Sequence, residues 1–132
     1  MKLVNARIVT RDVPGLTTFY ESVTGVAPVG SDEYVEFHLG GATLAICSAS
    51  VIRLFEQHAG TTVTNRSIIL DFEVDDVDLE RTRLDGIVSD WILEPKTQPW
   101  GNRTMMFRDP DGNPVNVFSR ASTRPKPPGG WA

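Results

Sequence analysis

The chain has 132 residues, enough for one globular domain whose core needs no disulfide or metal ion. Its formal net charge of −4 argues against nucleic acid as a partner, because phosphate binding requires a concentrated basic surface. No apolar run is long enough to span a membrane, the first residues lack a signal-peptide pattern, and the single cysteine, Cys47, suits a reducing compartment, so we expect a cytoplasmic protein.

The first half of the chain predicts a strand, a helix, a hairpin and a short crossover helix. Asp12 can cap the first helix, Pro14 suits its first turn, and Gly25 can end it in the left-handed conformation. The predicted ranges are a strand over 3–10, the helix from Asp12 to Gly25, strands over 33–39 and 42–48, and the crossover helix within 49–60.

The second half predicts the same kinds of element. Asp75-Asp76-Val77 begins a helix that we expect to carry Leu79 and Leu84 on its apolar face and to stop at Gly86. The predicted strands cover about 67–72, 90–94, 103–108 and 115–119, and the last two are joined by a turn at 109–113, DPDGN.

The two halves repeat one pattern. Asp12 and Asp76 each follow a strand and begin a helix, and they lie 64 positions apart. A glycine ends each predicted helix, and the order strand–helix–strand–strand–strand occurs twice. We interpret this as an internal duplication.

Side chains alternate across a strand, so the predicted strands have two faces of different character. The face expected to bury against the helices holds Val4, Ala6, Ile8, Leu44, Ile46, Ile68, Leu70, Phe72, Val115 and Val117. The mixed face holds Asn5, Arg7, Val9, Thr43, Ala45, Cys47, Ser67, Ile69, Asp71, Asn116 and Phe118. A plain solvated face would explain the second set, but its recurrence in both halves favours a ligand-binding cleft.

Two motifs resemble a known superfamily. The run RDV at 11–13, with Phe19-Tyr20 and Gly25, resembles the start of glyoxalase / bleomycin-resistance / dioxygenase modules, the vicinal oxygen chelate fold. PWGNR at 99–103 and FRDPDGN at 107–113 resemble their closing hairpin, most closely that of bleomycin-resistance-type members.

The resemblance covers about residues 3–119. It implies an α+β fold of two βαβββ modules, about 1–60 and 61–119, that form a curved mixed sheet with a concave cleft within one domain. It also implies a homodimer. We expect residues 120–132, rich in proline and glycine, to form a flexible tail.

Metal-dependent members of the superfamily hold a divalent ion with four His or Glu side chains. The positions that match those ligands here are Asn5, Ala45, Ser67 and Asn116. Amide and hydroxyl groups are poor ligands for transition metals and alanine is none, so we expect no metal and no other cofactor.

The expected ligand-binding residues are Asn5, Arg7, His38, Ser67, Asp71, Trp100, Arg103, Asn116 and Phe118. His38 shares a strand face with Glu36 and Tyr34, an arrangement open to acid–base chemistry or an unorthodox metal site, although a solvated edge strand is the favoured explanation. We expect Cys47 to be a small buried thiol.

The first hypothesis is therefore a metal-independent binding protein that sequesters a small organic molecule, such as an antibiotic or another natural product. The second is a lyase, isomerase or dioxygenase-type enzyme, metal-free or with a displaced metal site at His38 and Glu36. The third is a regulatory module with a vestigial cleft. None involves nucleic acid or a membrane.

Overall fold

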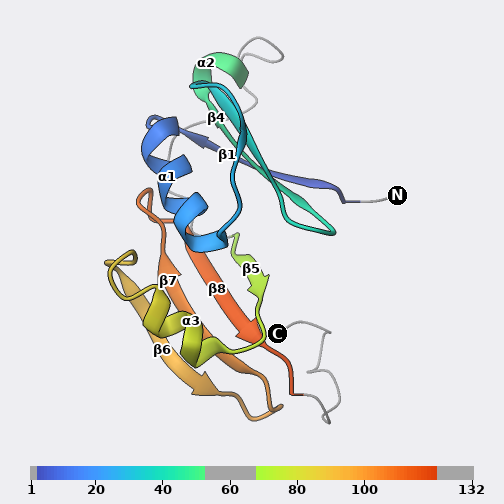
Figure 1. Ribbon diagram of the computed structural model, residues 1–132, viewed down its shortest axis with the longest axis vertical. Helices are drawn as coiled ribbons and strands as arrows, with labels where there is room; N and C mark the ends of the chain where they lie inside the picture. Colours follow the sequence, from blue (N-terminus) through green and yellow to red (C-terminus); the bar gives the residue numbers. More distant parts are fainter. Residues whose placement is uncertain (1–2, 53–67, 122–132) are drawn as a thin grey trace. The chain divides into compact units, whose positions relative to one another are not determined.

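The computed structural model describes residues 3–52 and 68–121, which form an α+β fold in two compact units, Met1–Thr64 (unit 1) and Asn65–Ala132 (unit 2) (Figure 1). Unit 1 contains β1 (Asn5–Thr10), α1 (Val13–Thr24), β2 (Val29–Gly30), β3 (Tyr34–His38), β4 (Thr43–Ser48) and α2 (Ala49–Ile52). Unit 2 contains β5 (Leu70–Glu73), α3 (Val77–Arg83), β6 (Trp91–Thr97), β7 (Arg103–Arg108) and β8 (Pro114–Ser119).

The two units share one topology. Each holds a four-stranded mixed sheet, ordered β1-β4-β3-β2 in unit 1 and β5-β8-β7-β6 in unit 2. The first and last strands of each unit pair in parallel, and the other neighbours pair antiparallel. The repeated strand–helix–strand–strand–strand order predicted from the sequence is confirmed.

The helix caps follow the predicted signals. The Asp12 carboxylate accepts a hydrogen bond from the Gly15 amide at 3.0 Å, and Gly25 ends α1 with a φ of 71°. The Asp76 carboxylate accepts from the Leu79 amide at 3.1 Å. Helix α3 ends at Arg83, before the predicted stop at Gly86, because a turn follows at Leu84.

Helices α1 and α3 bury apolar residues against their own sheets. Leu16 and Tyr20 of α1 are fully buried, and α1 contacts β4, where Leu44 and Ile46 lie on the same buried face as Phe37 of β3. Helix α3 contacts β6, β7 and β8, and its Val77 is fully buried. The corresponding face of unit 2 carries Leu70, Phe72, Met105, Phe107, Val115 and Val117.

Four apolar side chains predicted to be buried are exposed instead. Leu79 is 66% exposed because it lies two residues, about 200° of helical rotation, from buried Val77. Val4 and Ile68 are 54% and 63% exposed because they precede β1 and β5, the outer strands of their sheets. Ala6, near the start of β1, is exposed as well.

Several strands differ from their predicted extents, and β5 covers Leu70–Glu73 where the prediction was about 67–72. The two-residue strand β2 was not expected, because Val29-Gly30 is too short to give an alternating pattern. Strand β6 continues through Pro95 to Thr97, beyond the predicted end at 94. Proline is tolerated there because β6 is an outer strand, and its register against β7 shifts on both sides of Leu93.

The predicted turn between β7 and β8 is present and is held by Asp109. Its buried carboxylate accepts hydrogen bonds from the amides of Asp111 and Asn113 at 2.9 and 2.8 Å, and from the Asn113 side chain at 2.8 Å. Gly112 has a φ of 88°, which favours glycine. The DPDGN motif is therefore structural.

Three predictions fall outside the described residues. They are the role of Ser67, the crossover helix beyond Ile52, and the tail from residue 122 onward. Within the described residues, no helix is long and apolar enough to cross a membrane.

Candidate functional site

Polar side chains gather on the face of the unit 1 sheet that is opposite α1. The strand register sets them in rows across β1, β4 and β3: Asn5, Thr43 and His38; Arg7, Ala45 and Glu36; Val9, Cys47 and Tyr34. We call this set the unit 1 polar face. It contains three of the residues predicted to bind a ligand, Asn5, Arg7 and His38.

A run of polar contacts follows β3 along this face and continues to β4. The Tyr34 hydroxyl donates to Glu36 Oε2 at 2.8 Å, and His38 Nε2 lies 3.5 Å from Glu36 Oε1. His38 Nδ1 lies 3.4 Å from Thr43 Oγ1 on β4. Both carboxylate oxygens of Glu36 therefore have partners on its own strand, and the hydrogen bond to Glu36 orients the Tyr34 hydroxyl.

Arg7 reaches from β1 over the central strand to β3. Its guanidinium carbon lies 5.7 Å from the centroid of the Tyr34 ring, although β4 runs between the two strands. The intervening β4 side chains, Ala45 and Cys47, are small and fully buried. A large side chain at either position would obstruct this stacking contact, which is a cation–π interaction.

The surroundings shift two pKa values on this face. Burial, the hydrogen bond to Glu36 and the charge of Glu36 raise the pKa of the Tyr34 hydroxyl, and Arg7 opposes them. Burial raises the pKa of the Cys47 thiol, again against the influence of Arg7. Both groups are therefore neutral near pH 7, so Tyr34 serves as a hydrogen-bond donor and Cys47 is an inert thiol, as expected from the sequence.

On the equivalent face of unit 2, the side chains bond and pack with other residues of the same unit. Asn116 is buried, donates from Nδ2 to Asp71 Oδ1 at 2.8 Å, and accepts a hydrogen bond from the Thr104 hydroxyl. Phe118 is also buried, and the Arg120 guanidinium lies 5.3 Å from its ring centroid. Three predicted site residues, Asp71, Asn116 and Phe118, thus share one face and support one another.

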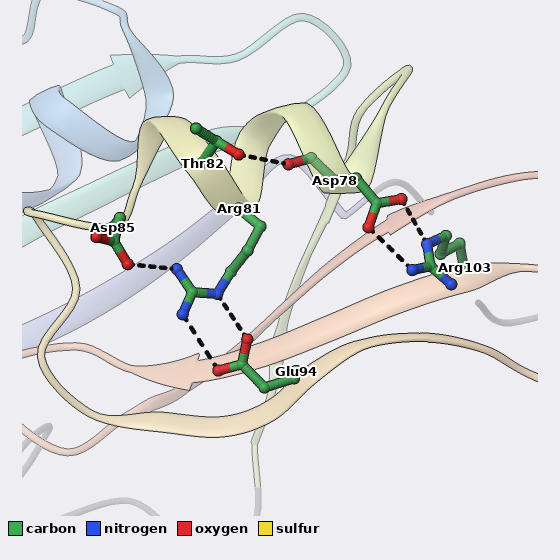
Figure 2. Close-up of polar contacts among 6 residues, drawn as sticks. All are labelled: Asp78, Arg81, Thr82, Asp85, Glu94 and Arg103. Atoms are coloured by element: carbon green, nitrogen blue, oxygen red, sulfur yellow. Dashed lines mark hydrogen bonds and ion pairs between the residues drawn. The ribbon is translucent and has the colours of Figure 1, made fainter.

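Arg103 lies on the other face of unit 2. It alternates with Met105 and Phe107 along β7, on the side covered by α3, and forms a two-point ion pair with Asp78 at 2.6 and 2.9 Å (Figure 2). This hydrogen bonding lowers the pKa of Asp78 and raises that of Arg103. Arg103 is therefore bound to Asp78 of α3, and it is not part of the unit 2 face that holds Asn116.

A second arginine, Arg81 of α3, also makes structural contacts. Arg81 bonds Glu94 and Asp85, at 2.8 Å to each (Figure 2). Its guanidinium carbon lies 3.8 Å from the Trp91 ring centroid. It ties the helix to the outer strand β6. Trp100 lies half-buried in the turn between β6 and β7, apart from the strand faces.

The metal-ligand positions do not fit a divalent ion. Ala45 has no donor atom, and both ends of the Asn116 amide are engaged by Asp71 and Thr104. By the spacing of the two helix caps, the counterpart of Asn5 is Ile69, which has no donor atom either. Across residues 3–52 and 68–121, no three His, Cys, Asp or Glu side chains are grouped to hold a metal.

Comparison with known families identifies the fold. The model of the glyoxalase-like domain matches residues 3–121, nearly the whole described chain. The chain belongs to the glyoxalase-like family. A comparison with curated proteins gave no significant match.

Solved structures with the glyoxalase-like fold are similar over most of their length. A glyoxalase-related enzyme from Fulvimarina pelagi is 20% identical, with a TM-score of 0.79 over 99% of this chain and 96% of that one. A glyoxalase/bleomycin resistance protein/dioxygenase family enzyme from Burkholderia phytofirmans PsJN is 19% identical, with a TM-score of 0.78 over 90% and 98%. A lactoylglutathione lyase from Agrobacterium tumefaciens is 21% identical, with a TM-score of 0.66 over 89% and 92%. Such low identities establish the fold alone.

The structure adds residues that the sequence did not place in the site. Tyr34, Glu36 and Thr43 belong to the unit 1 polar face, and Thr104 and Met106 to the unit 2 face. For Tyr34 and Glu36 the signal was present, because they alternate with His38 along one strand. No sequence pattern indicated Thr104, because the register of β7 against β8 decides which residues it meets.

Proposed function

We propose that this glyoxalase-like protein binds a small organic molecule on the unit 1 polar face, without a metal ion. The observation that carries the proposal is the clustering of Asn5, Arg7, Glu36 and His38 on a rigid sheet whose opposite face is the hydrophobic core. Rigid strands that present a few convergent polar groups are typical of ligand sites.

The chemistry of the face supports a neutral or charged organic ligand over a metal ion. It offers a guanidinium, a phenol, an imidazole and an amide, which hydrogen-bond and stack with organic groups. Its only carboxylate, Glu36, is occupied by Tyr34 and His38. Sequestration of a natural product such as an antibiotic is the role that we propose for such a site.

Asp71, Asn116 and Phe118 were also expected to contact the ligand, and they stay candidates for contact within unit 2 alone. Ser67, Trp100 and Arg103 were also expected to contact the ligand. Ser67 lies outside the described residues, Trp100 stays a candidate, and Arg103 is left out because Asp78 occupies its guanidinium.

We also propose that the protein is a cytoplasmic homodimer. Large apolar side chains are exposed beside the outer strands β1 and β5: Leu3, Val4, Ile68 and Ile69. Clusters of exposed apolar residues favour association. Light scattering during size exclusion should give twice the chain mass, and a monomer at micromolar concentration would contradict this part.

Binding is tested by titrating 15N-labelled protein with a library of small acids, amines and neutral aromatics while recording amide spectra. We expect a binder to shift the amides of β1, β3 and β4. Thr43→Val should weaken binding about 3- to 10-fold through the loss of one hydrogen bond. Thr18→Val, the same change at an exposed position on α1, is the matched control. Binders that leave all three strands unshifted would refute the proposal.

The contacts among Tyr34, Glu36 and His38 favour one alternative, an enzyme that uses His38 as an acid or base oriented by Glu36. The two proposals differ in the fate of the ligand. Mass spectrometry after prolonged incubation should recover the bound compound unchanged. A chemically altered product, lost in His38→Ala, would establish the enzyme instead.

A further inference from the structure

Arg7 differs from most of the other arginines in the described segments. Arg81, Arg83, Arg103, Arg108 and Arg120 each form an ion pair with a carboxylate. Arg7 forms none with any residue of segments 3–52 and 68–121, although the chain carries 17 acidic residues and a net charge of −4. The absence of an ion pair is notable because Arg7 lies in the same row of the sheet as the carboxylate of Glu36.

The contacts explain why Glu36 does not neutralise Arg7. One Glu36 oxygen accepts from the Tyr34 hydroxyl at 2.8 Å, and the other lies 3.5 Å from His38 Nε2. The Arg7 guanidinium carbon instead lies 5.7 Å from the Tyr34 ring centroid, and the guanidinium makes no ion pair with a carboxylate of the described residues. Arg7 is also exposed, so a ligand can reach it.

A hydrogen-bond acceptor lies beside this cation. Asn5 Oδ1 is buried and receives no hydrogen bond from any described residue. Asn5 and Arg7 are two positions apart on β1 and point to the same face, so their Cα atoms are roughly 6.6 Å apart. Asn5 as a residue is only half-buried, so rotation of its side chain toward the face would let a ligand donor pair with Oδ1, which is costly to leave unpaired.

We infer that the unit 1 polar face selects small organic acids, with the ligand carboxylate on Arg7 and a hydroxyl or amino donor on Asn5. This inference rests on the proposed binding function and names its ligand class. A planar carboxylate matches the two parallel N–H groups of a guanidinium, which gives short, charge-assisted bonds. The acidic chain as a whole repels anions, so only a specific short-range contact favours such a ligand.

The test compares 4-hydroxybenzoate with its neutral counterpart 4-hydroxybenzamide by amide-detected titration. The acid should bind at least about tenfold more tightly, the typical effect of a charged hydrogen bond. Arg7→Gln should remove this difference, because the acid loses a charge-assisted contact and the amide loses at most a neutral one. Arg83→Gln, which removes the same charge from α3, is the control and should change neither affinity.

A second comparison isolates Asn5. Benzoate lacks the donor group, so 4-hydroxybenzoate should bind more tightly than benzoate to the parent protein and equally to Asn5→Ala. The Arg7 side-chain Nε–H resonance provides a readout that needs no variant, and it should shift when 4-hydroxybenzoate is added to the parent protein.

The outcomes separate the two proposals. Equal binding of the acid and the amide on β1, β3 and β4 would overturn the selection of acids and leave the binding function intact. Equal competition by sulfate would show that the face recognises charge alone, and it would also overturn the inference. Failure of the acids, the amide and 4-hydroxybenzylamine to bind this face would refute both.

Discussion

Asn116→Asp tests whether the amide that closes the unit 2 face is required as an amide. The change keeps the size of the side chain and replaces the Nδ2 donor, 2.8 Å from Asp71 Oδ1, with an oxygen. Two carboxylates then face each other. Their repulsion at a relaxed separation of about 4 Å is about 1 kcal/mol in water and about 4 kcal/mol at an effective dielectric constant of 20. Because Asn116 is buried and Asp71 is exposed, we expect a loss of roughly 2–3 kcal/mol in the free energy of unfolding at neutral pH.

The two carboxylates of this variant also determine whether its stability rises or falls with pH. Like charges raise the pKa of the carboxylate pair in the folded state, so the folded variant holds more protons than the unfolded chain. Its stability relative to the parent protein therefore falls as pH rises through the raised folded pKa. The deficit should be small below the unfolded Asp pKa of about 3.9 and complete near pH 7.

Urea denaturation followed by tryptophan fluorescence, at pH 7.5 and pH 4.0, measures both effects. The swapped double variant, Asp71→Asn with Asn116→Asp, restores one donor and one acceptor and should recover at least half of the lost stability at pH 7.5. Equal stability of Asn116→Asp and the parent protein at pH 7.5, or a deficit unchanged at pH 4.0, would refute the reasoning.

Two further substitutions have predicted effects on the stability of the protein. Gly25→Ala should cost about 1–2 kcal/mol because the backbone at Gly25 has a φ of 71°, and no atom lies within 4 Å of the added Cβ, so the loss of thermal stability measures conformational strain alone. The hydrogen bond to Arg103 lowers the pKa of Asp78, so this ion pair stabilises the fold above the unfolded Asp pKa and its contribution fades as pH falls through the lowered value. Asp78→Asn should therefore reduce the melting temperature slightly at pH 7 in low salt and not at all in 1 M salt, because the pair is exposed.

Much of the fold could be predicted from local signals. Asp12, Gly25 and Asp76 mark helix ends through hydrogen bonds and backbone angles that depend on neighbouring residues only. The prediction for Leu79 was wrong because this residue lies about 200° of helical rotation from Val77, the residue that α3 buries against its sheet. The extension of β6 through Pro95 depended on its being an outer strand, which is a property of the whole sheet.

The candidate site was predictable only in part, for a related reason. The alternation of Tyr34, Glu36 and His38 is visible in one strand, but their proximity to Arg7 depends on how β1, β4 and β3 pair. Likewise, the assignment of Arg103 to the α3 side required the register of β7. Sequence patterns assign residues to faces within a strand, whereas pairing between strands decides which residues meet.

The matched sheet rows of the two units have consequences for how the chain can change over evolution. The row Arg7, Ala45 and Glu36 in unit 1 corresponds to the row Asp71, Asn116 and Met106 in unit 2. In unit 1 a methyl group stands at the centre, whereas in unit 2 an amide fills that position and joins its neighbours. Substitution of exposed Arg7 in the first row should therefore cost little to folding, while substitution of buried Asn116 in the second should destabilise the fold.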